Sequence, residues 1–150
     1  MTSPSLDRIL TCVDFSEVTD AVIAYTCTLA ALAGAEVRLL HVAAPNPDFV
    51  GYEAGPDTVR KQVAHELRDE HRKLEALAER VREGNVRAGC LMVQGATVET
   101  ILEQARRFRA NVVIIGSHGH SRLRHLIAGS VAQGVLREST VPVLVVPDRK

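Results

Sequence analysis

Aromatic residues are scarce in this sequence, which has no Trp, two Tyr and three Phe among 150 residues. Proteins that bind single-stranded nucleic acid stack bases on aromatic side chains, so this class is disfavoured. The formal net charge is zero, so no overall positive field attracts a phosphate backbone or an anionic membrane. No apolar run approaches the roughly 18 residues that a membrane-spanning helix requires. We therefore expect neither nucleic acid nor a membrane as a partner.

Cysteine is also rare, with only Cys12, Cys27 and Cys90 and no CxxC pair. Each cysteine lies among apolar residues, so we expect three buried free thiols. Free thiols are typical of a reducing compartment. The first residues, MTSPSLDR, show no basic stretch leading into an apolar core, so we expect no signal peptide. Together these features predict a cytoplasmic protein.

Acidic residues are absent between Gly116 and Arg137, and this segment carries the most informative motif of the chain. Gly116, Gly119, Gly129 and Ser130 follow the pattern G-x2-G-x9-G-S, directly after the apolar run 112–115. Glycines let the backbone approach an anion closely, and the first N–H groups of a helix point toward it. Five basic or titratable side chains lie in the same segment: His118, His120, Arg122, Arg124 and His125. The motif therefore predicts a phosphate site.

Several other interpretations of this segment stay open. The glycines also suit a plain connection from a strand to a helix. A phosphate loop of the type GxxxxGK[ST] is absent and the region has no lysine, so backbone, hydroxyls and histidines such as His118 would hold the phosphates. Arg122 and Arg124 are equally consistent with a solvated surface. A zinc site on His118, His120 and His125 is disfavoured because no cysteine or carboxylate lies near them.

Hydrophobic periodicity predicts strands that alternate with helices along one domain, residues 1–150. The expected strands are 8–13, 36–42, 86–93, 111–115 and 141–146. The expected helices run from a Ser16 cap to Gly34, from Asp57 to about Arg82, and over 97–109 and 129–138. Residues 43–57 are expected to form a flexible loop beside the site. The apolar stripe of the first helix is expected to be Val18, Val22, Tyr25, Leu29 and Leu32.

Alternating strands and helices predict an α/β fold, an open parallel sheet with helices on both faces. Ligands of such sheets bind beyond the carboxyl ends of the strands, where the strand order reverses. The first strand ends at Asp14 and the fourth at Gly116, so both face one crevice if these strands are neighbours. Asp14 is a predicted ligand contact, and it also suits an Asx turn before the first helix.

Four features make the chain resemble the universal stress protein family, in its ATP-binding branch. They are Val13-Asp14-Phe15-Ser16, Leu39-Leu40-His41-Val42, the glycine motif, and the segment 141–146, and together they span nearly the whole chain in the family's order. Asn111 departs from the family, which usually has an acidic residue there. Because Asn111 opens a strand, we expect little effect on the site.

The resemblance implies a five-stranded sheet in the order 3-2-1-4-5 and a homodimer joined through the last strand. It also implies ATP as the ligand, with magnesium as a further possibility. Asp14 would contact the nucleoside and the backbone of Val42 would line the adenine pocket. The ribose and phosphates would lie against Gly116, Gly119, Gly129 and Ser130, with Val131 adding a backbone N–H and His118 a side-chain contact.

Pro142 independently marks the last strand as an edge strand. Proline has no N–H group to donate to a neighbouring strand, so within sheets it is found mainly at edges. A bare apolar edge favours pairing with a second chain; a cover formed by residues 147–150 is the alternative. With this edge strand, the resemblance implies a homodimeric, ATP-dependent regulatory module of the stress response. A slow ATPase and a nucleotide-free scaffold of the same fold are the alternatives, and no catalytic residue or metal ligand is assigned.

Overall fold

The computed structural model describes residues 4–44, 57–119 and 128–148 of the chain. Every predicted strand and helix is present in this part of the chain, with ends within two residues of the prediction. In order, the elements are β1 (Arg8–Cys12), α1 (Thr19–Ala33), β2 (Glu36–Ala43), α2 (Asp57–Glu83), β3 (Ala88–Gln94), α3 (Thr97–Phe108), β4 (Val112–Gly116), α4 (Ser130–Glu138) and β5 (Val143–Val146).

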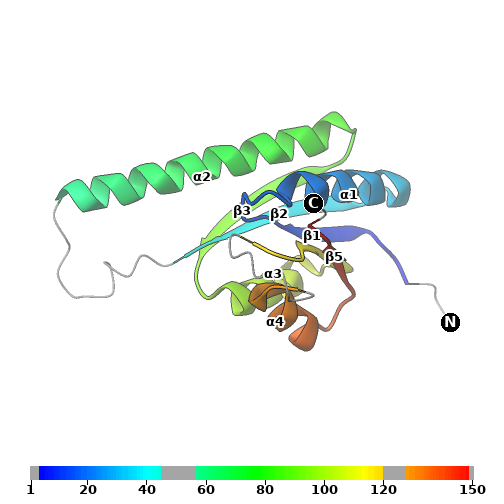
Figure 1. Cartoon of the computed structure of the whole chain (residues 1–150). Coiled ribbons are helices and arrows are strands. Elements are labelled where there is room, and N and C mark those ends of the chain that lie inside the picture. Colours follow the sequence, from blue (N-terminus) through cyan, green and yellow to red (C-terminus); the bar gives the residue numbers. More distant parts are fainter. Residues whose placement is uncertain (1–3, 45–56, 120–127, 149–150) are drawn as a thin grey trace.

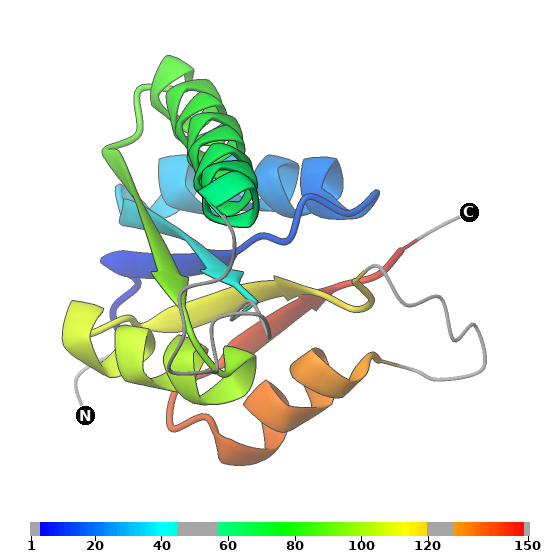
Figure 2. The ribbon, with the colours of Figure 1, turned by 90° about the vertical axis from the view of Figure 1, so that its left-hand side faces the viewer.

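The five strands form one parallel sheet in the order β3-β2-β1-β4-β5, which confirms the expected order. Helices α1 and α2 cover one face of the sheet, and α3 and α4 cover the other (Figure 2). The chain is therefore a single three-layer α/β domain, as the alternation of strands and helices predicted.

Both faces of the sheet are buried, so neighbouring residues of one strand belong to different cores. Ile9 packs under α1 and α2, whereas Leu10, the next residue, packs under α3 and α4. Leu39 and Leu40 divide in the same way, and all four side chains are at most 1% exposed. This pattern explains the continuous apolar runs of the central strands, because successive side chains point to opposite, equally covered faces.

The buried face of α1 differs from the predicted stripe. Val18 and Val22 are buried as predicted, and Leu29 packs against the core. Tyr25 and Leu32, however, are 52% and 82% exposed. The helix also buries Thr19, Ile23, Thr26 and Ala30, which were not predicted. Helix α1 is apolar on most of its sides, so periodicity alone does not single out one face. Thr26 can face the core because its hydroxyl pairs with Thr11 Oγ1 at 2.9 Å and donates to the carbonyl of Val22.

The ends of α1 confirm one prediction and correct another. Gly34 ends the helix in the left-handed conformation, with φ of 66°, as expected of a C-terminal glycine. Ser16 is not the N-cap: the helix begins after Val18, and its start has no side-chain cap among the described residues. The Ser16 side chain instead hydrogen-bonds Asp14, which competes for the same hydroxyl.

Asn111 lies at the amino ends of the strands. Its Oδ1 accepts hydrogen bonds from the backbone N–H groups of Asp7 and Arg8, at 3.0 and 2.8 Å. The residue thus fastens the start of β1 to the start of β4, at the edge of the sheet opposite Asp14 and Gly116.

Helix α2 extends well beyond the carboxyl edge of the sheet, on the side where β2 ends (Figure 1). Its buried side chains, Leu74, Leu77, Ala78 and Val81, all lie in its second half. The apolar residues at helical spacing in its first half, Val59, Val63 and Leu67, are only partly buried. The helix is therefore fixed by its second half, and its first half projects past the sheet.

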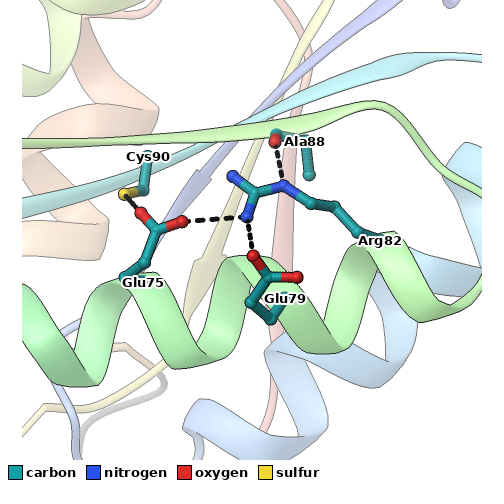
Figure 3. A network of polar contacts seen from close by, with 5 residues as sticks. All are labelled: Glu75, Glu79, Arg82, Ala88 and Cys90. Carbon is teal, nitrogen blue, oxygen red and sulfur yellow. Dashed lines mark hydrogen bonds and ion pairs between the residues drawn. The ribbon is translucent and has the colours of Figure 1, made fainter.

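A polar network fastens the second half of α2 to β3 (Figure 3). The Arg82 guanidinium donates to Glu75 at 2.8 Å, to Glu79 at 2.5 Å and to the carbonyl of Ala88 at 2.7 Å. The Cys90 thiol donates to the other oxygen of Glu75 at 2.9 Å. Cys12 is buried as predicted, but Cys90 and Cys27 are only partly buried, which corrects the expectation for these two free thiols.

The network shifts the titration of its members in opposite directions. Burial, and then the hydrogen bond to the Glu75 carboxylate, raise the pKa of Cys90 from 9.0 to about 11. The hydrogen bonds from Cys90 and Arg82 lower the pKa of the Glu75 carboxyl. Cys90 is therefore a protonated, weakly nucleophilic thiol at neutral pH.

We predict that Cys90 makes the fold sensitive to alkaline pH. Between pH 9 and about 11 the unfolded chain releases the thiol proton while the folded chain keeps it, so the free energy of unfolding falls as pH rises. Urea unfolding at pH 8 and pH 10.5 should show a smaller decrease for Cys90→Ala than for the wild type. An equal decrease in both proteins would contradict the assignment.

Candidate functional site

The sheet opens at the carboxyl ends of β1 and β4. These strands pair in register, with Ile9 opposite Val112 and Thr11 opposite Ile114, yet the chain leaves β1 toward α1 on one face and β4 toward α4 on the other. A cavity of about 370 Å³ lies at this point of divergence. Its lining includes all eight residues predicted from the sequence: Asp14, Val42, Gly116, His118, Gly119, Gly129, Ser130 and Val131.

Asp14 is held in a tight turn directly after β1. Its Oδ1 accepts hydrogen bonds from the backbone N–H of Ser16 at 3.0 Å and from the Ser16 hydroxyl at 2.5 Å. These contacts form the Asx turn that the sequence allowed. Phe15, inside the turn, has a φ of 61°, a left-handed conformation that non-glycine residues rarely adopt. The carboxylate is therefore presented to the cavity in a fixed orientation.

Gly119 lies directly against Asp14. A Cβ atom added at Gly119 would sit 2.5 Å from Oδ2 of Asp14, closer than any normal contact. A Cβ added at Gly116 would collide with Cγ1 of Val18, a stiff β-branched side chain that is only 5% exposed. The two glycines thus let the backbone after β4 approach the turn after β1.

Ser117 joins the two ends of the glycine motif, a role that sequence analysis missed. Its carbonyl accepts the N–H of Gly129 at 2.6 Å, and its own N–H donates to the carbonyl of Val146 at 2.8 Å. Its hydroxyl accepts the N–H of Asp148 at 3.1 Å and lies 3.0 Å from Nδ1 of His118. Ser117 is 4% exposed. Its hydrogen bond with Gly129 holds the start of α4 beside the end of β4. Its place inside the GSHG string was the one available signal.

The first turn of α4 brings backbone N–H groups to the cavity. Gly129 is the N-cap in an extended conformation, with no side-chain cap among the described residues and no acidic residue in the first turn. The first N–H groups of a helix have no partner within the helix, and the helix dipole adds partial positive charge there. Ser130 and Val131 belong to this first turn and line the cavity. This end of the cavity therefore favours an anion.

The rest of the wall is mostly apolar and comes partly from elements that the sequence did not indicate. Val42, Leu40 and Ile115 come from the strands, whereas Thr97 and Ile101 come from α3. Helical periodicity explains Ile101 as a core residue and says nothing of the cavity. An apolar wall with an anion-favouring end suits a ligand with a flat apolar part and a charged part.

Two polar groups in this wall are also buried. The Thr19 hydroxyl has no hydrogen-bond partner among the described residues. The Cys12 thiol is 8% exposed, and burial raises its pKa to about 12. Cys12 is therefore a neutral part of the wall at physiological pH and not a nucleophile.

Some predicted features lie outside the described residues, namely His120, Arg122, Arg124, His125 and most of the loop 43–57. Within the described ranges, no three His, Cys, Asp or Glu side chains are arranged to hold a metal ion. No helix within those same ranges is both long and apolar enough to cross a membrane.

Comparison with known proteins gives a consistent picture. The model of the universal stress protein family matches residues 5–147. The universal stress protein MJ0577 of Methanocaldococcus jannaschii is 26% identical over 151 residues, covering 93% of both chains. The solved structure of MJ0577 superimposes with a TM-score of 0.83, at 27% identity, over 97% of this chain and 98% of the other.

Two more distant structures share the fold and were solved with adenine nucleotides. A universal stress protein in complex with cAMP has a TM-score of 0.70 at 19% identity, covering 95% of this chain and 98% of that protein. The protein from Archaeoglobus fulgidus in complex with dAMP has a TM-score of 0.64 at 19% identity, covering 93% and 96%.

The collision at Gly116 yields a prediction about stability. Gly116→Ala forces Val18 and the start of α1 away from β4, so it should lower the free energy of unfolding by about 1–3 kcal/mol. Gly89→Ala is the matched control, because Gly89 also lies in a strand and its added Cβ meets nothing within 4 Å. Urea unfolding of both variants measures the difference. Equal stability of the two variants would show that the approach of α1 to β4 is loose.

Proposed function

The chain belongs to the universal stress protein family, and from this premise we propose that it binds an adenine nucleotide, ATP, in the cavity between β1 and β4. The observation that carries the proposal is the glycine-lined gap between the Asp14 turn and the start of α4. A Cβ at Gly119 would crowd Oδ2 of Asp14, and the first turn of α4 lines the same cavity. The gap provides backbone N–H groups without side chains that would exclude a phosphate.

Each predicted residue has a distinct role in this proposal. The Asp14 carboxylate accepts hydrogen bonds from ribose hydroxyls, since an ionised carboxylate only accepts. Val42 contributes the backbone at the end of β2, against which the adenine lies. The ribose and phosphates lie along the glycine motif, within reach of the remaining residues: Gly116, His118, Gly119, Gly129, Ser130 and Val131.

The electrostatics of the cavity favour binding over phosphoryl transfer. The α4 end offers backbone dipoles and hydroxyls, and no lysine lies between Gly116 and Arg137 to act as a point charge on the transferred group. Magnesium would enter with the ATP phosphates and supply positive charge between them. The cAMP and dAMP complexes of distant relatives support an adenine nucleotide as the ligand class. We propose a cytoplasmic module of the stress response whose state depends on the bound nucleotide.

Gly129→Asp tests the placement of the phosphates. Among the described residues, a Cβ at Gly129 meets the carbonyl of Ser117 at 3.4 Å and Cα of His118 at 3.7 Å, both ordinary contact distances, so we expect the fold to accommodate a side chain. A negative charge beside the phosphates should lower the affinity for ATP at least about 100-fold, because like charges in contact oppose binding by several kcal/mol. Isothermal titration calorimetry with ATP measures the loss.

Gly129→Asn is the matched control, because asparagine has nearly the volume of aspartate and no charge. We expect it to bind ATP much more tightly than the Asp variant. If the Asp variant binds ATP as the wild type does, the phosphates lie elsewhere. Failure of the wild type to bind any adenine nucleotide at millimolar concentration would refute the proposed function itself.

The second part of the proposal is a homodimer joined through β5. This strand lies at the edge of the sheet, beside β4 only. The N–H groups of Val113 and Ser117 donate to the carbonyls of Pro142 and Val146, so alternate β5 residues pair with β4. The backbone groups of Val143 and Val145 therefore point to the open side of the strand, where a second chain can pair with them.

Val145→Pro removes one of these outward N–H groups and leaves the bonds to β4 intact. It should yield monomers at micromolar concentration, whereas Val145→Thr, which keeps the N–H group and β-branching, should remain dimeric. Sedimentation velocity distinguishes the two states. A dimeric Val145→Pro protein would place the interface away from β5.

A further inference from the structure

His41 connects β2 to the turn that carries Asp14. Its side chain is buried, at 7% exposure, and Nδ1 lies 2.8 Å from the carbonyl oxygen of Val13. A carbonyl only accepts hydrogen bonds, so Nδ1 carries the hydrogen and donates it. Val13 directly precedes Asp14, so this hydrogen bond holds the peptide on the amino side of the carboxylate.

The same imidazole also holds the residue on the other side of Asp14. The ring centroids of His41 and Phe15 are 4.6 Å apart, and the rings are tilted by 43°. Phe15 is the residue with the left-handed backbone, a conformation that persists only where its surroundings enforce it. His41 therefore contacts both neighbours of Asp14, Val13 and Phe15. Neither contact involves a residue of the glycine motif.

Helix α2 reaches this turn through two charged side chains. Oε2 of Glu70 lies 3.4 Å from Nε2 of His41, and the Lys73 ammonium lies 5.9 Å from the centroid of the Phe15 ring. Nε2 of His41 has no hydrogen bond among the described residues. The imidazole therefore contacts the Asp14 turn through Nδ1 and α2 through Nε2.

These contacts lie at the boundary between the second half of α2, which packs on the sheet, and its first half, which projects past the sheet. The buried side chains of the helix begin at Leu74, one residue after Lys73, and the preceding part extends past the sheet (Figure 1). The position of the projecting half thus depends on side-chain contacts near residues 70–73. Those contacts are with His41 and Phe15, which also define the Asp14 turn.

We propose that His41 is a positioning residue for Asp14, and that its contact with Glu70 couples nucleotide binding to the docking of α2. This inference rests on the proposed function, in which Asp14 contacts the nucleoside. A nucleotide binds the turn best in its ordered form, and the ordered form is the one that holds Glu70. By linkage, docking of α2 must then raise nucleotide affinity by the same factor as the nucleotide stabilises docking.

Two substitutions at His41 separate positioning from mere packing. His41→Leu removes the donor to Val13 and should weaken ATP binding about tenfold, the loss expected for a buried hydrogen bond that orders a ligand contact. His41→Asn places an amide N–H where Nδ1–H lies and should restore the affinity to within about threefold of the wild type. Equal affinity of His41→Leu and wild type in calorimetry would refute the positioning role.

The coupling to α2 is tested at Glu70, whose side chain is 36% exposed, so its replacement does not threaten the core. Hydrogen exchange of residues 57–73 is measured with and without saturating ATP. ATP should slow exchange there in the wild type and should have little effect in Glu70→Ala, which removes the contact with Nε2 of His41. Equal slowing in both proteins would refute the coupling, whatever the outcome at His41.

Asp69→Ala is the matched control on the same turn of α2. Asp69 pairs with His65 and Arg72, both on α2 itself, so this variant loses surface charge without touching the Asp14 turn. It should respond to ATP as the wild type does; loss of the response here as well would assign the effect to helix charge and refute the coupling through His41.

The outcomes also separate this inference from the proposed function. Wild-type protein that binds ATP, together with variants that bind and respond equally well, refutes the inference alone. Wild-type protein that binds no adenine nucleotide refutes both.

Discussion

The structure depends on one topological constraint: β1 and β4 are hydrogen-bonded neighbours whose chains leave toward opposite faces of the sheet. The register of Ile9 with Val112 and of Thr11 with Ile114 brings the ends of the two strands to the same height. Because α1 follows one strand on one face and α4 follows the other on the opposite face, no element can close the space between them. The cavity is therefore a consequence of strand order before any side chain is considered.

Close packing of the backbone around that opening explains the residues in its wall. Gly116 approaches Val18 and Gly119 approaches Asp14, and each approach excludes a Cβ atom. Ser117 then fixes the start of α4 beside the end of β4 through its own backbone and hydroxyl. The result is a gap with helix donors at one end and an oriented carboxylate at the other, the arrangement from which the proposed nucleotide site follows.

Helix α2 connects this opening with a distant part of the surface. Its second half is held by Leu74, Leu77 and the Arg82 network, and its first half extends past the carboxyl edge of the sheet (Figure 1). The Glu70–His41 contact lies at the boundary between these halves and at the back of the Asp14 turn. Among the described residues α2 does not line the cavity itself; it reaches the Asp14 turn through Glu70 on His41 and Lys73 over Phe15.

The sequence by itself determined the order and approximate ends of the elements, the three-layer class, and the meeting of Asp14 with the glycine motif, because periodicity, glycine spacing and strand ends are local properties. Val42 and Val131 were assigned to the site only through the family resemblance. The sequence did not determine which face of α1 is buried, since that helix is apolar on most sides, nor that Ser16 would serve Asp14 instead of capping the helix. Only the tertiary structure decided three further features. These are the place of Thr97 and Ile101 in the cavity wall, the contacts of Ser117, and the pairing of His41 with Glu70. Each joins residues far apart along the chain, and such pairs depend on how whole elements pack against one another, which no local pattern encodes.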